Sequence, residues 1–227
     1  DPTTARGPTD RRTRCRVLLI GLTVISAIGP LRPTTRSIPP APDPALSNTA
    51  SPTAKLTVRD GRLLQAARQG QLATVRRLLT DGASPNAAFA GEGSPLILAT
   101  RHGHADVVAA LLQHGADPNL AVIGDGNPLI AAATTGQTHI AARLIADGAR
   151  LNAVVPGDET ALITASAKGH LDVVRLLTQA GAQPALRVRA PTVHSASGFE
   201  WRTALAMAKR NGHHQIVSFL LDLGVRE

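Results

Sequence analysis

Residues 94–119 read SPLILATRHGHADVVAALLQHGADPN, and residues 160–182 read TALITASAKGHLDVVRLLTQAGA. Both segments carry a Gly-His pair and, twelve residues later, a Gly-Ala pair. These glycines belong to two series that advance together by 33, 33, 33 and then 43 residues. The first series is Gly70, Gly103, Gly136, Gly169 and Gly212, and the second is Gly82, Gly115, Gly148, Gly181 and Gly224. The shared period indicates stacked supersecondary units, each of which buries its apolar face against its neighbours.

Each unit is predicted to contain two short helices. A small polar residue is suited to cap the first helix, and leucine and alanine three residues apart give that helix a narrow apolar stripe. A glycine then breaks the chain before a second apolar helix, which ends at a glycine in the left-handed conformation. The capping residues are Ser94, Asn127, Thr160 and Thr203, followed in two units by Pro95 and Pro128, and the stripes are formed by Leu96, Leu129, Leu162 and Leu205 with Ala99, Ala132, Ala165 and Ala208.

The unit resembles the ankyrin repeat, whose T-P-L-H-x-A, G-H and L-L-x-x-G-A-D-x-N signatures are nearly complete in residues 94–119. The resemblance extends from Asp60 to Val225. It implies an all-α solenoid of five helix–turn–helix units with β-hairpin finger loops. The expected units are residues 60–87, 88–120, 121–153, 154–186 and 187–227.

Charge and composition argue against nucleic acid as a partner and against a disulfide framework. The net charge of +8 divides unevenly, because residues 1–59 carry +6 and residues 60–227 only +2. The repeats therefore lack the concentrated basic footprint of a phosphate binder. Cys15 is the only cysteine, so an internal disulfide cannot form.

The repeated histidines are expected to be structural. His104, His170 and His213 occupy one phase of the repeat, so they should be spread along the stack instead of converging on one ion. No phosphate-binding loop and no activated nucleophile is evident. We therefore expect no metal, no cofactor and no catalytic residue in this chain, although a longer parent polypeptide could be an enzyme.

The N-terminal part of the chain has the pattern of a membrane segment. Residues 1–16 form a basic flank, expected to be cytoplasmic, and residues 17–31, VLLIGLTVISAIGPL, are uncharged. Residues 32–59 are rich in proline and predict an extended linker. A last transmembrane helix, a signal anchor, a cleaved signal peptide and a buried apolar helix remain open as interpretations of residues 17–31. The expected location is the bacterial inner membrane with periplasmic repeats, and the alternative is secretion to the periplasm.

A narrower resemblance concerns the ankyrin tails of antirepressor-type (BlaR/MecR-like) membrane metallopeptidases. It rests on GDGNPLI at residues 124–130, VVPGDETALI at residues 154–163 and EWRTALAMA at residues 200–208. In that family a zinc protease domain precedes a final membrane helix and an exported, sensor-like tail. The present sequence contains no H-E-x-x-H, so no catalytic or zinc residue can be assigned by this resemblance.

A protein partner is expected on the fingers and on the concave face formed by the first helices, and the oligomeric state stays open. The candidate helix positions are Arg101, His102, Thr134, Thr135, Lys168 and Arg210, and the candidate finger positions are Phe89, Glu92, Asp125, Asp158 and Glu159. The aspartates could instead only order their own turns beside glycine. As an alternative to a membrane-bound interaction or sensory domain, we consider a soluble exported protein that binds or protects a partner enzyme.

The ten additional residues before the last unit predict a long β-hairpin finger. Residues 186–189 and residues 199–202 alternate apolar and charged side chains around a segment with Pro and Gly. The hairpin holds the only tryptophan, and Trp and Arg are frequent at interface hot spots. The candidate residues are Arg187, Arg189, Phe199 and Trp201. Phe199 and Trp201 could instead fold down over the C-terminal end of the stack.

Overall fold

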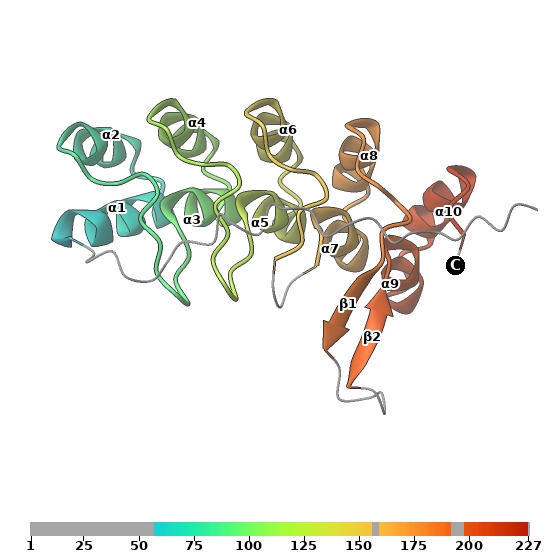
Figure 1. Ribbon diagram of the computed structural model, residues 1–227. Coiled ribbons are helices and arrows are strands. Elements are labelled where there is room, and N and C mark those ends of the chain that lie inside the picture. The colour runs from blue at the N-terminus through green and yellow to red at the C-terminus, as the bar shows by residue number, and fades with distance from the viewer. Residues whose placement is uncertain (1–56, 156–158, 192–197, 227) are drawn as a thin grey trace, which may run out of the picture. The chain divides into compact units, whose positions relative to one another are not determined.

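The computed structural model describes residues 57–155, 159–191 and 198–226, and these residues form ten helices and one two-stranded sheet (Figure 1). In chain order the elements are α1 (Val58–Arg68), α2 (Leu72–Thr80), α3 (Pro95–Arg101), α4 (Ala105–Gln113), α5 (Pro128–Thr135), α6 (Thr138–Ala146), α7 (Ala161–Lys168), α8 (Leu171–Gln179), β1 (Val188–Pro191), β2 (Phe199–Arg202), α9 (Ala204–Arg210) and α10 (His214–Asp222).

The helices form two rows, as Figure 1 shows. The odd-numbered helices α1 to α9 form an inner row in which each packs on the next, and the even-numbered helices form an outer row. Each outer helix also packs on the inner helix that precedes it in the chain. The helical repeat fold predicted by the 33-residue period is thereby confirmed for the described residues.

Side-chain caps start four of the inner helices, as the sequence predicts. The hydroxyl of Ser94 accepts a hydrogen bond from the backbone N–H of Ile97 at 3.2 Å, and the Asn127 amide oxygen accepts one from Ile130 at 2.8 Å. Thr160 and Thr203 cap α7 and α9 in the same way. A cap of this kind contributes about 1 kcal/mol, since it satisfies a donor that would otherwise lack a helical partner.

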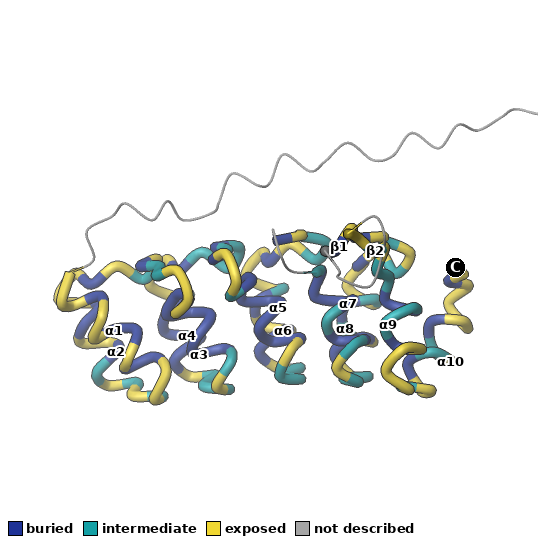
Figure 2. The backbone as a smooth tube through the Cα atoms, turned by 90° about the horizontal axis from the view of Figure 1, so that it is seen from below, coloured by how far each residue is buried: buried dark blue, intermediate teal, exposed yellow. Residues whose placement is uncertain are grey.

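The core runs along the stack between the helices. The predicted leucines are almost completely buried, and the predicted alanines have no exposed surface. Alanine lets adjacent inner helices approach closely, and a buried leucine contributes about 1.5–3 kcal/mol through the hydrophobic effect. Figure 2 shows these buried stretches passing through successive helices, whereas the loops and β2 carry more exposed residues.

Two repeating hydrogen-bond patterns join adjacent units. In the first pattern, the histidine that follows the glycine donates its Nε2–H to a backbone carbonyl in the inner helix of the previous unit. His104 donates to Arg68 of α1 at 3.1 Å, and His170 donates to Thr134 of α5 at 3.1 Å. His213 repeats the contact with Ala167 at 3.0 Å. These bonds give the repeated histidine the structural role expected from its phase.

The second pattern uses the asparagine that ends the G-A-D-x-N signature. The Asn119 amide donates to the Gly148 carbonyl at 3.0 Å, and its oxygen accepts from the Arg150 N–H at 2.8 Å. Asn86 makes the equivalent pair of bonds one unit earlier. Each asparagine therefore satisfies backbone groups of the next unit, which explains its place in the repeat.

The first unit begins slightly earlier than the boundary expected at residue 60. Thr57 and Asp60 form a capping box, so α1 starts at Val58. The second carboxylate oxygen of Asp60 accepts a hydrogen bond from the Ser84 N–H at 2.9 Å and ties α1 to the following loop. Burial raises the pKa of Asp60, but the hydrogen bonds from Ser84 and Thr57 outweigh it and hold the pKa below its usual value.

This depressed pKa predicts a loss of stability in acid. The contribution of Asp60 to the free energy of unfolding is fully present above the unfolded-state pKa of about 3.9 and is lost as the pH falls through the lower folded-state value. In the Asp60→Asn variant, urea unfolding between about pH 5 and pH 2 should therefore show a smaller decline than in the unaltered chain. Parallel stability curves for the two proteins would show that Asp60 contributes nothing through its charge.

The predicted N-terminal segments lie outside the described residues. These are the basic flank of residues 1–16, the apolar segment of residues 17–31 and the linker as far as residue 56. Within the described part of the chain, no helix has the length and apolar character needed to cross a membrane.

Candidate protein-interaction surface

The finger that precedes α9 is a β-hairpin, as the alternating pattern predicts. β1 and β2 pair antiparallel, with Arg189 opposite Trp201 and Ala190 opposite Glu200. Two of the earlier fingers are closed by isolated bridges only, between Phe89 and Gly93 and between Val122 and Gly126. In Figure 1 the hairpin projects from the side of the inner helices on which those fingers also lie.

Alternation along the strands gives the hairpin two different faces. On one face Val188 and Ala190 are buried, and Glu200 and Arg202 are partly buried. On the opposite face Trp201 is 59% exposed and Phe199 is 42% exposed. The two rings are therefore not buried against the C-terminal end of the stack, which was the alternative considered for them.

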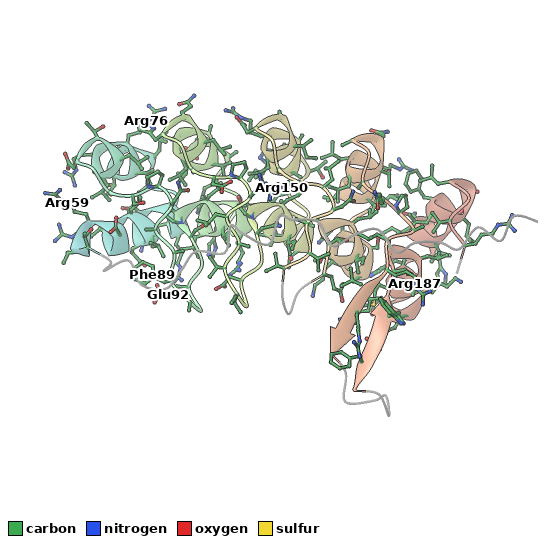
Figure 3. The ribbon with its side chains drawn as sticks, in the orientation of Figure 1. Arg59, Arg76, Phe89, Glu92, Arg150 and Arg187 are labelled. Atoms are coloured by element: carbon green, nitrogen blue, oxygen red, sulfur yellow. The ribbon has the colours of Figure 1, made fainter. Side chains whose placement is uncertain are left out.

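We call the exposed side, formed by Arg187, Arg189, Phe199 and Trp201, the outer hairpin face. The Arg187 guanidinium lies over the Trp201 ring, 5.2 Å from its centroid, and that of Arg189 lies 3.9 Å from the centroid of Phe199. Both pairs join diagonal neighbours across the strands. Figure 3 places Arg187 beside the hairpin. The four predicted hairpin residues thus lie together on one surface.

The inner face of the hairpin carries an ion-pair network. Arg202 pairs with Glu159 of the preceding finger and with Glu200 at 2.5 Å, and Arg210 of α9 pairs with Glu200 at 3.2 Å. The hydrogen bond from Arg202 lowers the pKa of Glu200, and the bond to Glu159 raises the pKa of Arg202. The network fastens the hairpin to the preceding finger through Glu159 and to α9 through Arg210.

A groove of about 500 Å³ lies between this network and the inner helices α5, α7 and α9, and we call it the finger-side groove. Its apolar lining consists of Ile130, Ala167, Ala190 and Met207, and its polar lining consists of Thr134, Glu159, Thr164, Lys168, Arg202 and Asn211. Lys168 is exposed, and the described residues provide no ion-pair partner for it. The groove therefore presents mainly polar and charged groups, with a smaller apolar part.

Several predicted residues have structural partners. Thr134 and Thr135 donate their hydroxyls to carbonyls one turn earlier in α5. Arg101 of α3 pairs with Asp125 of the next finger at 3.2 Å and also bonds to its carbonyl, so this aspartate does more than order its own turn. Asp158 lies outside the described residues.

The remaining candidates lie in the second unit, residues 88–120. Phe89 is half-buried against Leu64 and Leu98, whereas Glu92 is exposed at its finger, as the labels in Figure 3 indicate. His102 is exposed and stacks on His104 with ring centroids 6.2 Å apart. Desolvation lowers the pKa of His102, and the nearby charges of His104, Arg68 and Arg101 lower it further.

The structure adds residues that the sequence analysis did not select. Glu200 and Arg202 complete the network, and Ile130, Thr164 and Met207 line the groove. The alternation of the hairpin was a usable signal for Glu200 and Arg202, since it places both on the face opposite Trp201. The groove residues gave no such signal, because their position depends on how three helices pack.

The fold and this surface define a class of protein: a stack of helix pairs whose fingers project on one side. A family model described as ankyrin repeats (3 copies) matches residues 55–122 and 120–188. The chain belongs to the ankyrin-repeat family. The fifth unit extends beyond the matched residues, yet α9 and α10 repeat the pairing of the earlier units. A search of curated proteins found no match, so no comparison supports the narrower resemblance to metallopeptidase tails.

Proposed function

We propose that this chain is a non-catalytic module that binds a protein partner through the finger-side groove and the outer hairpin face. Ankyrin repeats generally mediate binding to protein partners and are typically non-catalytic. The observation that carries the proposal is the exposure of Trp201 and Phe199 under stacked arginines, on the hairpin face opposite to the one that lines the groove. Exposed aromatic and arginine side chains of this kind contribute strongly to protein interfaces.

Site-specific photo-crosslinking tests this proposal. A photoreactive amino acid at position 168 in the groove should give a crosslinked partner, whereas the same group at position 142 on α6 should give none. Ala142 is a suitable control because it is exposed on an outer helix, away from the fingers. A partner captured equally well from both positions, or only from position 142, would contradict binding on the finger side.

We further propose that the repeats are displayed on the outer side of a bacterial membrane, anchored by residues 17–31. The arginines before this uncharged segment outnumber those after it, which supports a cytoplasmic N-terminal side. Alkaline phosphatase fused after residue 59 should be active and remain in the membrane fraction. Activity in the soluble periplasmic fraction would support the exported alternative, and an inactive fusion would contradict both.

The last proposal is that the repeats are the regulatory tail of a membrane metallopeptidase. It rests on the three sequence segments named above and on the anchor-and-linker pattern of residues 17–59. The coding frame upstream of residue 1 tests it. An H-E-x-x-H motif among further apolar segments is the expected result, and a start codon within a few tens of codons would remove the connection.

A further inference from the structure

We propose that the outer hairpin face recognises an acidic, extended segment of the partner protein, with carboxylates at alternate positions. This inference rests on the proposed function and specifies the chemistry of the partner. In it, the carboxylates pair with Arg187 and Arg189, and the methylene groups of the same acidic side chains lie against Trp201 and Phe199.

The first argument is charge. Each guanidinium of the outer hairpin face contacts an aromatic ring, and no described carboxylate lies within ion-pair distance of either one. The inner face of the same hairpin is different, because Arg202 already has two carboxylate partners. The charge that the hairpin offers to a partner is therefore positive, and a negatively charged segment is its complement.

The second argument is preorganisation. A guanidinium stacked on a ring keeps the N–H groups along its edge available, and these can bind a carboxylate with two parallel hydrogen bonds. Stacking also restricts the arginine side chain before binding, which reduces the entropy lost on association. Arg187 and Arg189 are two residues apart, about 6.6 Å along a strand, which matches acidic residues at alternate positions of an extended segment.

The third argument distinguishes an acidic protein segment from nucleic acid. Stacked aromatic and arginine side chains also bind single-stranded nucleic acid. Affinity for nucleic acid, however, grows with the number of phosphates neutralised, and residues 60–227 together carry a net charge of only +2. Two arginines beside two rings fit a short acidic motif better than a phosphate backbone.

The single tryptophan provides the readout for the test. Trp201 is the only tryptophan and the chain has no tyrosine, so its fluorescence reports on this face alone. The probe is a capped peptide of alternating glutamate and leucine, and its control is the same peptide with glutamine in place of glutamate. The glutamate peptide should shift the Trp201 emission to shorter wavelength in a saturable manner, and the glutamine peptide should bind at least about tenfold more weakly.

Variants assign the effect to the two arginines. The double variant Arg187→Glu/Arg189→Glu should weaken binding of the glutamate peptide at least about tenfold. Arg175→Glu is the matched control, because Arg175 lies 5.7 Å from the centroid of the Phe219 ring but is not part of the hairpin. The Arg175→Glu variant should bind the glutamate peptide with unchanged affinity. Circular dichroism should confirm that both variants stay folded, since all three arginines are exposed.

Three results would overturn the inference: no response to the glutamate peptide, equal binding of the glutamine peptide, or tighter binding of single-stranded oligothymidylate. None of them would by itself remove the proposed function, because photo-crosslinking from position 168 is independent of the hairpin charges. Loss of the crosslink would count against the function itself.

Discussion

Replacing Gly136 with alanine is expected to lower the free energy of unfolding by about 3 kcal/mol. Gly136 has a φ of 72°, where a Cβ atom costs about 1 kcal/mol. In addition, the new Cβ would lie 2.7 Å from Nδ1 of the His170 ring. The ring would have to move, and its hydrogen bond to the Thr134 carbonyl would weaken or break. The loss therefore combines backbone strain, overpacking and a hydrogen bond between units.

Gly148→Ala is the matched control for this substitution. Gly148 has a φ of 90° in the same unit, but no atom lies within 4 Å of the position that its Cβ would take. Its substitution should cost only the backbone term of about 1 kcal/mol. Urea unfolding followed by circular dichroism gives both values. Equal losses for the two variants would mean that the histidine contact between units contributes nothing to stability.

Replacing Arg202 with alanine should release the hairpin from the stack. Arg202 separates two carboxylates, Glu159 and Glu200, and its removal leaves the largely buried Glu159 without its partner. Loss of a fully buried pair costs about 3–5 kcal/mol, but partial solvent exposure here reduces the expected cost to about 1–2 kcal/mol. Limited proteolysis should cleave the hairpin of the variant faster than that of the unaltered chain, and Trp201 fluorescence should change.

Arg143→Ala controls for the loss of an arginine at the surface. Arg143 of α6 pairs with Asp147, the residue that follows the last residue of this helix, and both side chains are more exposed than those of Arg202 and Glu159. Its removal should cost no more than about 0.5 kcal/mol and leave proteolysis of the hairpin unchanged. If the Arg202 variant matched this control, the ion-pair network would not hold the hairpin in place.

Local features of the fold could be predicted from the sequence because each depends on neighbouring residues. The caps at Ser94 and Asn127 act three residues away, and alternation over residues 186–202 was enough to predict the hairpin. Contacts across the repeats were not predicted. The bond from Arg101 to Asp125 joins an inner helix to the next finger, and it depends on packing that no periodicity encodes.

The same distinction applies to the candidate surface. Arg187 and Trp201 were found because tryptophan occurs once and because Trp and Arg are frequent at interface hot spots, whereas their shared face follows from the register of the two strands. The sequence did not show whether the rings of Phe199 and Trp201 are exposed or covered, because this depends on whether the hairpin bends over α9. The residues that line the groove could not be predicted either, because they come together only when three helices pack. Thr164 and Met207 were missed for this reason.

Quenching of the Trp201 fluorescence tests the central claim most directly, namely that this chain presents an exposed, positively charged aromatic surface for a partner. Iodide should quench Trp201 efficiently and caesium much less, because Arg187 and Arg189 attract the anion and repel the cation. The difference should shrink at high salt, since the charges are exposed. A Trp201 ring shielded from both ions, or quenched equally by both, would contradict the account.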